Sequence, residues 1–256
     1  MRYAITVEYD GAGYSGWQRQ LNAPTVQQTV EEALRVLTGE ETVIVGSGRT
    51  DAGVHAAGQV AHFDTARELD VYRFRYSLNA LLPEDVKVVK MQRVADDFHA
   101  QYSAKQKTYS YGMYISRTPS PLRRGRFVRI TPPFDVEKFV AAARMFEGEH
   151  DFKAFGNVGS EVSTTVRTIY SAEVKVCGDE VVLYLTGNGF LYNMVRVIAG
   201  TLVRVATGKM PSEEIERMFA EGTRTHGIKT LPPYGLTLEK VFYNIFPPEG
   251  KLKRRF

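Results

Sequence analysis

Residues 45–65 read VGSGRTDAGVHAAGQVAHFDT, a glycine-rich loop between two predicted strands, 41–48 and 55–65. An amphipathic helical pattern precedes this loop, with Thr25 as the predicted N-cap and Gly39 as the predicted stop. After the loop, a second helix is predicted at residues 71–82, and outer strands are predicted at 2–10 and 85–94. The loop therefore joins the two middle strands of a predicted β-α-β-β-α-β order.

The second half of the chain repeats this order of elements. A strand with alternating aromatic residues is predicted at 105–116, and helices are predicted at 135–150, 191–208 and 212–222. Residues 166–189 have the pattern of a hairpin that turns at Cys177-Gly178-Asp179, and residues 235–246 have that of a closing strand.

Two copies of one order predict an α+β fold with two split β-α-β (ferredoxin-like) halves, whose antiparallel sheets meet at a central cleft. We expect residues 1–103 to form an N-terminal α+β domain that carries the Asp51 loop, and residues 104–256 to form a C-terminal α+β domain. A cleft between two related halves is a suitable place for a long ligand.

The 256-residue chain is 43% hydrophobic and 24% charged, which is ordinary for a globular protein. No apolar run reaches the ~18 residues that a membrane-spanning helix needs, and the N-terminus lacks the pattern of a signal peptide. The single cysteine, Cys177, cannot form an internal disulfide. These features predict a protein of the reducing cytoplasm.

The formal net charge is only +4, but the basic residues are gathered in two places. The stretch Arg117–Arg129 contains five arginines and no acidic residue, and the last six residues, KLKRRF, add four cations. Gathered cations predict an electrostatic surface for a polyanion such as RNA or DNA. A solvated basic loop and a frayed basic tail are the alternative that charge alone leaves open.

The glycine-rich loop does not fit the two common phosphate-binding motifs. Gly48 and Gly53 have the spacing of a P-loop, but Val54 and His55 stand where Lys and Ser or Thr are required. The third glycine of a dinucleotide-binding fingerprint is also missing, and Asp51 would repel a phosphate. We therefore exclude both kinds of phosphate loop.

Metal binding and hydrolase chemistry are disfavoured as well. His55 and His62 are seven residues apart, so on a continuous strand they point to opposite faces, and hydrogen-bonded or exposed histidines are the preferred interpretation. Paired-carboxylate hydrolysis needs a second acid, and the nearest one, Asp64, lies on the far side of a predicted strand. The nucleophile motif G-x-S-x-G does not occur in the sequence.

Asp51 close to Arg49 is the chemical feature that remains. A nearby cation lowers the pKa of a carboxyl group, and an ionised aspartate can act as a covalent nucleophile or as a base. Gly48 and Gly53 would let the backbone approach a bound ring closely. A structural salt bridge or an Asx turn is the alternative, and local chemistry by itself favours that alternative.

The wider sequence changes this balance, because GRTDAGVHAAGQVAHF resembles the signature loop of the TruA-type tRNA pseudouridine synthases. The resemblance spans nearly the whole chain. Further blocks match in the expected order: YDGAGYSGWQRQ, FHAQYSAKQKTYSYGMY, TTVRTI, GFLYNMVRVIAGTLV and PPYGLTLEKVFY.

The resemblance implies an enzyme that isomerises uridine to pseudouridine at positions 38, 39 and 40 in the anticodon stem-loop of tRNA. The glycosidic bond breaks, the base rotates, and a carbon–carbon bond forms, without a metal or an organic cofactor. The essential aspartate is Asp51 by motif match, and sequence leaves open whether it attacks C6, adds to C1′ or removes a C2′ proton. The resemblance also implies a homodimer, and a C-terminal domain that completes the uridine pocket and the RNA-binding cleft.

Further roles are implied for residues at matching positions. Tyr109 would pack on the target uracil, and Arg49 would pair with Asp51, contact a phosphate or fill the gap left by a flipped nucleotide. Arg167 would approach the aspartate, and Leu236 would form an apolar wall of the pocket. An additional strand aromatic, an exposed strand charge and a core leucine are the respective alternatives for Tyr109, Arg167 and Leu236. Weaker candidates for RNA contact are Gln18, Arg19, Arg123, Arg124, Arg126 and Arg196, while Trp17 is expected to pack in the core.

Two competing functions remain from the residues themselves. An RNA-binding or RNA-folding protein without chemistry would explain the basic stretch and the aromatic strand, and it would make no product. A hydrolase that uses Asp51 would cleave the same glycosidic bond but release uracil. The presence of both Asp51 and Tyr109 favours the isomerase.

Overall fold

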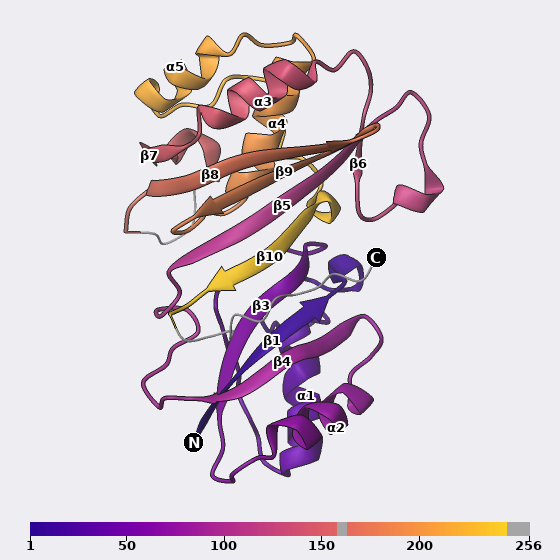
Figure 1. Ribbon diagram of the computed structural model, residues 1–256, viewed down its shortest axis with the longest axis vertical. Coiled ribbons are helices and arrows are strands. Elements are labelled where there is room, and N and C mark those ends of the chain that lie inside the picture. Colours follow the sequence, from indigo (N-terminus) through magenta and orange to yellow (C-terminus); the bar gives the residue numbers. More distant parts are fainter. Residues whose placement is uncertain (158–162, 245–256) are drawn as a thin grey trace. The chain divides into compact units, whose positions relative to one another are not determined.

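The computed structural model describes residues 1–157 and 163–244, a mixed α/β structure with five α-helices in those ranges (Figure 1). These residues divide into two compact units. The first unit contains Met1–Ala52 and Ala56–Lys105, together with residues 240–244. The second unit contains Gly53–His55 and Gln106–Glu239. The basic tail at residues 251–256 lies outside the described residues.

The first unit contains an antiparallel sheet with the strand order β4-β1-β3-β2. The strands are β1 (Arg2–Tyr9), β2 (Val45–Gly46), β3 (His55–Asp64) and β4 (Val86–Val94). Helices α1 (Val26–Thr38) and α2 (Val71–Leu81) contact each other, and α2 packs on β4. The order of elements along this unit is the β-α-β-β-α-β order that the sequence predicts.

Helix α1 begins and ends where the sequence predicts. The Thr25 side chain accepts a hydrogen bond from the Gln28 amide at 3.4 Å, and Gly39 adopts φ 73°, the left-handed conformation that ends many helices. Val26, Val30 and Leu34 are fully buried, so the apolar stripe of α1 faces the core.

Strand β2 is much shorter than the strand predicted at residues 41–48. Helix α1 binds the backbone of Ile44: its N–H donates to Glu31 Oε1 at 3.1 Å, and its carbonyl accepts from Gln27 Nε2 at 3.1 Å. The buried Glu31 carboxylate also accepts from Arg19 Nη1 at 3.1 Å. Because side chains already satisfy this backbone, it needs no neighbouring strand.

A buried histidine of β3 makes the stability of the first unit depend on pH. His62 Nδ1 accepts from the Ala100 amide at 3.1 Å, and its ring lies 5.0 Å from that of His99. Burial, helped by the charges of Arg2 and His99, lowers the pKa of His62 to about 4. In the unfolded chain His62 is protonated as the pH falls below about 6.5, whereas in the folded chain it is protonated only below about pH 4.

We expect the free energy of unfolding to fall between pH 6.5 and pH 4, because protonation of this histidine then favours the unfolded state. His62→Gln keeps an acceptor for the Ala100 amide but cannot titrate. Urea unfolding of both proteins at pH 7 and pH 4.5 measures the difference. The wild type should lose more stability than the variant, and equal losses would contradict the assignment.

The second unit contains a sheet with the strand order β10-β5-β9-β8-β7, and the short strand β6 pairs in parallel with β5. The strands are β5 (Gln106–Ile115), β6 (Val128–Ile130), β7 (Gly148–Asp151), β8 (Val166–Cys177), β9 (Glu180–Gly187) and β10 (Leu236–Phe242). Cys177 pairs with Glu180, which confirms the predicted hairpin turn. The last residues of β10, from Lys240, belong to the first unit.

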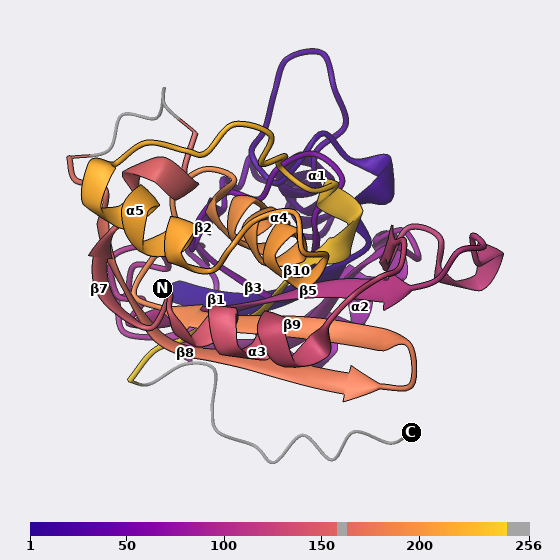
Figure 2. The same cartoon turned by 90° about the horizontal axis from the view of Figure 1, so that it is seen from above.

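Three helices lie on one side of this sheet: α3 (Val136–Arg144), α4 (Met194–Ala206) and α5 (Glu213–Glu221) (Figures 1 and 2). Helix α4 is buried along most of its length, as its predicted apolar pattern requires. No helix in residues 1–157 or 163–244 has the length and apolar character needed to cross a membrane.

Two strands of the second unit differ from the sequence-based expectation. Helix α3 ends at Arg144, and strand β7 overlaps the end of the region predicted as one helix, 135–150. Gly148, at the start of β7, has φ 105°, which a helix cannot accommodate. Strand β6 overlaps the end of the basic stretch Arg117–Arg129, where no strand was predicted. Its alternation of buried Val128, exposed Arg129 and buried Ile130 covers too few residues to be recognised as a strand.

Candidate functional site

Contacts within the first unit fix the residue that precedes Asp51. The Thr50 hydroxyl lies 2.7 Å from the Tyr9 hydroxyl, and the Thr50 carbonyl accepts from the Trp17 amide at 3.1 Å. A Cβ added to Gly16 would lie 2.5 Å from the Thr50 carbonyl oxygen, so Gly16 packs directly on this backbone. Trp17 is buried, which confirms its predicted packing role. The start of the chain thus holds the loop immediately before its carboxylate.

Gly16→Ala tests this close approach. Gly16 has φ 97°, so strain and the contact with Thr50 together should lower the free energy of unfolding by about 1–3 kcal/mol. Gly39→Ala is the matched control, because Gly39 has φ 73° but no atom lies within 4 Å of an added Cβ. Urea unfolding should show the larger loss for Gly16→Ala. Equal losses would mean that the contact with Thr50 contributes nothing.

Gln59 holds the beginning of the same loop. This fully buried side chain on β3 donates from Nε2 to the Gly48 carbonyl at 2.9 Å. Its Oε1 accepts from the Ser47 hydroxyl at 2.6 Å and from the Val60 amide at 3.1 Å. The loop is therefore fixed before Asp51 by side chains as well as by strand pairing, although it is rich in glycine.

Asp51 is half-buried, whereas Arg49 is exposed. The roles expected for Arg49, which are pairing with Asp51, contact with a phosphate and filling the gap left by a flipped nucleotide, stay predictions. The carboxylate of Asp51 thus lies in a loop with a fixed backbone, near an exposed cation.

The chain enters the second unit directly after Ala52. Val54 is buried in the core of that unit, and a Cβ added to Gly53 would lie 3.1 Å from Pro233 Cγ. His55 is 1% exposed, and its Nε2 lies 2.8 Å from the Gly125 carbonyl oxygen and 3.2 Å from the Tyr234 carbonyl oxygen. The residues that follow Asp51 are therefore fixed by packing and by polar contacts.

Tyr109 stands at the end of an apolar row on β5. Tyr111 and Met113, two and four residues further along, share its face and are fully buried in the core. Tyr109 is only half-buried, and its ring packs edge-to-face on Phe190 with the centroids 5.0 Å apart. The core therefore supports the Tyr109 ring from one side, and the ring remains partly accessible from the other.

Arg167 and Leu236 both lie in the second unit. Arg167 is half-buried and donates from Nη1 to the carbonyls of Thr164 and Val166, at 2.9 and 2.6 Å. Burial lowers the pKa of this guanidinium. Leu236 is 7% exposed and belongs to the core cluster, a position compatible with a pocket wall and with a core leucine alike.

The basic arm, residues 117–129, uses its arginines in two different ways. Arg123 forms a forked ion pair with Asp179 at 2.6 and 2.7 Å, donates to Glu180 at 2.9 Å, and lies over the Tyr114 ring. Asp179, through its hydrogen bonds, raises the pKa of Arg123. Arg124 and Arg126 are exposed. Arg123 therefore anchors the arm through its ion pair with Asp179, whereas Arg124 is exposed.

The remaining candidates for RNA contact differ in how many hydrogen bonds their side chains make within the protein. Arg196 donates from Nε to the Leu231 carbonyl at 2.7 Å and from Nη1 to Asn193 Oδ1 at 2.5 Å. Gln18 is exposed, and Arg19 is bound to the buried Glu31 described above. A shallow pocket of about 300 Å³ adjoins Arg19 and is lined by Arg19, Gln20, Leu21 and Gln28.

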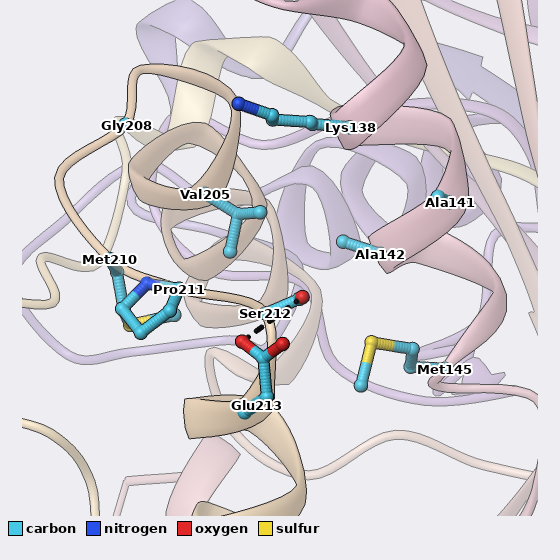
Figure 3. A pocket seen from close by; sticks show the side chains of 10 residues that line it. All are labelled: Lys138, Ala141, Ala142, Met145, Val205, Gly208, Met210, Pro211, Ser212 and Glu213. Atoms are coloured by element: carbon cyan, nitrogen blue, oxygen red, sulfur yellow. Dashed lines mark hydrogen bonds between the residues drawn. The ribbon is translucent and has the colours of Figure 1, made fainter.

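A larger pocket of about 490 Å³ lies beside α3, α4 and α5 (Figure 3). Its lining is mainly apolar, as with Ala142, Met145 and Val205, and Lys138 and Glu213 lie at its border. None of the predicted site residues lines this pocket. Within the described ranges no group of His, Cys, Asp and Glu is arranged to hold a metal ion.

The supporting residues of the loop were missed in the sequence. Thr50, His55 and Gln59 hold the loop backbone by hydrogen bonds. The two carbonyl contacts of His55 agree with its preferred interpretation as a hydrogen-bonded or exposed histidine. A polar residue inside an apolar strand, such as Gln59 in AAGQVAHF, is the one local signal that points to such a role.

Comparison with known proteins gives one consistent family. A family model described as tRNA pseudouridine synthase matches residues 5–103 and 142–244. A tRNA pseudouridine synthase A of Ruminiclostridium cellulolyticum is 46% identical over 240 residues, covering 93% of this chain and 98% of the relative. Proteins of the same name from Acetivibrio thermocellus and Caldicellulosiruptor bescii are 45% and 44% identical, each over 239 residues with the same coverage.

Proposed function

The chain belongs to the tRNA pseudouridine synthase family, and from this membership we propose that it isomerises uridine at positions 38, 39 and 40 of the tRNA anticodon stem-loop. The observation that supports a catalytic rather than a structural Asp51 is the construction of its loop. Buried partners hold Thr50 and Gly48 before it, and His55 is anchored after it. Such support is what a catalytic carboxylate needs, because its position must not vary.

The proposed reaction is an isomerisation, so substrate and product contain the same atoms. The bond between N1 of uracil and C1′ of ribose breaks, the base rotates, and a bond forms between C5 and C1′. The hydrogen on C5 leaves as a proton, and N1 gains a proton. Asp51 is the essential carboxylate in this sequence of steps, whether it attacks C6, adds to C1′ or removes a proton from C2′.

We propose that Tyr109 packs on the uracil and that Leu236 forms an apolar wall of the pocket. The half-buried ring of Tyr109, supported by Phe190, is suited to stacking on a flat base. Arg167 is proposed to stabilise the ionised Asp51. Its partial burial without a carboxylate partner among the described residues supports this role, because a desolvated guanidinium gains from an anion.

The two proposed functional domains are residues 1–103, which carry the catalytic loop, and residues 104–256, which complete the uridine pocket and the RNA-binding cleft. Each is proposed to be a split β-α-β (ferredoxin-like) fold. The strand orders β4-β1-β3-β2 and β10-β5-β9-β8 support this, because they repeat one arrangement in the two units. We also propose a homodimer that works in the cytoplasm, where its tRNA substrate is found.

Arg49, Gln18, Arg19 and Arg196 are proposed to contact RNA together with the basic arm. In the arm, exposed Arg124 is better placed for phosphate than Arg123, whose charge is already matched by Asp179 and Glu180, and exposed Arg126 is proposed as a further contact. Phosphate contacts release counterions, so binding through them weakens as salt rises.

Replacing both Arg124 and Arg126 by Ala should weaken tRNA binding and make its salt dependence shallower. We expect the slope of log Kd against log salt to fall by about 1 for each arginine. Fluorescence anisotropy with labelled tRNA at several salt concentrations measures this slope. Arg144→Ala, which removes an exposed cation on α3, is the control and should leave the slope unchanged. An unchanged slope in the double variant would exclude the arm from the phosphate contacts.

Site mapping tests the proposed specificity. A set of tRNAs is made in which the anticodon stem-loop carries a single uridine, placed at position 38, 39, 40 or one of the flanking positions. We expect pseudouridine at the three central positions and none at the flanking ones. Product confined to another arm of the tRNA would contradict the proposed substrate site.

A further inference from the structure

The basic arm follows the last residue of β5 and projects beyond that end of the strand (Figures 1 and 2). Tyr109 lies near the other end of the same strand. Strand β5 pairs with β9 without a break in register from Lys107 to Tyr114. One continuous, hydrogen-bonded strand of the second unit therefore connects Tyr109 to the arm.

The tip of the arm is anchored to the turn between β8 and β9. Arg123 binds the Asp179 carboxylate in this turn at 2.6 and 2.7 Å, and its guanidinium carbon lies 4.9 Å from the centre of the Tyr114 ring. The Tyr114 hydroxyl accepts a hydrogen bond from the Ser120 amide at 2.9 Å. The Ile115 amide donates to the Asp179 carbonyl at 2.8 Å, so the same turn holds both the start and the tip of the arm.

The returning part of the arm packs on β5 as well. A Cβ added to Gly112 would lie 3.0 Å from Phe127 Cδ1, so the Phe127 ring rests on the backbone of β5. Strand β6 then pairs in parallel with the last three residues of β5. Because the arm is held where it leaves the sheet, at its tip and where it returns, the tip keeps one position relative to Tyr109.

The tip presents an apolar side chain close to a cation. Leu122, in the 3₁₀ helix Pro121–Arg123, is 98% exposed, and Arg124 is exposed as well. Five arginines without an acidic residue in this stretch favour a polyanion as its partner. An RNA helix has a wide, shallow minor groove that displays riboses with their 2′-hydroxyls beside the phosphates. Leu122 is suited to pack on such riboses while Arg124 binds a phosphate.

The length of β5 sets how far the tip lies from a uracil stacked on Tyr109. Arg123 lies over Tyr114, which is five residues from Tyr109, and five residues of an antiparallel strand span about 17 Å. At about 3.4 Å per nucleotide along one strand of a helix, this distance covers about five base steps. RNA that contacts the tip at this distance does so beyond the nucleotides next to the target uridine.

We propose that the arm tip, through Leu122 and Arg124, contacts the minor groove of an RNA helix about five base steps from the uridine that stacks on Tyr109. The tip then selects RNA in which a helix continues beyond the target site. Asp179 is a positioning residue, because its ion pair with Arg123 fixes the direction of the tip. This inference rests on the proposed function, and it assigns these residues no part in the bond-making steps.

RNA hairpins of increasing stem length test the proposed distance. The target uridine keeps one place beside the loop, while the stem above it is lengthened from about two to about ten base pairs. The single-turnover kcat/KM of the wild type should rise about tenfold as the stem passes about five pairs. Leu122→Ala/Arg124→Ala should show no such rise. It should equal the wild type on the shortest hairpins, which also shows that the variant is folded.

Two further variants separate the direction of the tip from its charge. Asp179→Asn keeps every arginine but lacks the carboxylate that binds Arg123, so it should lose most of the rise. Arg144→Ala removes an exposed cation of α3 and should keep the rise. An equal rise in the wild type and the double variant, or no rise in the wild type, would overturn the proposal. A wild type that forms no pseudouridine in any hairpin or in full-length tRNA would instead refute the proposed function itself.

Discussion

Asp51→Asn should abolish pseudouridine formation while leaving tRNA binding nearly unchanged. The amide has the shape of the carboxylate but carries no charge and is a poor nucleophile and base, so we expect the single-turnover rate to fall by ~10³-fold or more. Such a loss corresponds to at least about 4 kcal/mol of transition-state stabilisation. Conversion of tRNA to product is measured twice, once with tRNA in excess of enzyme and once in single turnover. The Kd for the same tRNA is measured alongside.

Asp64→Asn is the control for this result. Asp64 is a nearby carboxylate on β3 that forms an ion pair with Arg2 at 2.7 Å, so its replacement removes a charge without touching the loop. We expect it to lose stability but to retain the rate of isomerisation. Equal rates for Asp51→Asn and the wild type would show that Asp51 is only a structural residue of the loop.

Tyr109→Ala should lower kcat/KM by about 5- to 150-fold, because stacking of an aromatic side chain on a base contributes about 1–3 kcal/mol. Tyr109 is half-buried and packs on Phe190, so its ring can be removed without opening the centre of the core. Tyr109→Phe keeps the ring and should remain within about tenfold of the wild type. Pre-steady-state conversion of tRNA measures both variants.

The two replacements at Tyr109 separate the ring from its hydroxyl group. A Phe variant as inactive as the Ala variant would assign the function to the hydroxyl and contradict a stacking role. Tyr111→Phe is the control on the same strand, since the Tyr111 hydroxyl donates to the Pro232 carbonyl at 2.8 Å inside the core. It should reduce stability more than it reduces the rate.

The sequence predicts local features of the fold well where the chemistry is local. Thr25 and Gly39 limit α1 because a cap and a left-handed glycine act over one turn of helix. The turn at Cys177-Gly178-Asp179 is recognisable for the same reason. The helix predicted at 135–150 is too long, because α3 ends at Arg144 while the apolar pattern continues through Met145 and Phe146.

Long-range partners are what the sequence does not reveal. The position of Asp51 follows from the motif, but the contacts that fix its loop involve Tyr9 and Trp17, more than 30 residues away, and Gln59. Arg123 has the same appearance in the sequence as Arg124, and only the fold shows that Asp179 neutralises it. The difference between a structural and an exposed arginine is therefore a property of the folded chain.

Release of the hydrogen on C5 tests the isomerisation most directly. In pseudouridine C5 is bonded to C1′, so tRNA whose uridines carry tritium at C5 must lose that tritium to water as product forms. We predict tritium release by the wild type in proportion to the pseudouridine formed, with every base still attached to the tRNA, and no release by Asp51→Asn. Normal tRNA binding without tritium release, or the appearance of uracil detached from the tRNA, would contradict the assignment of this chain as an isomerase.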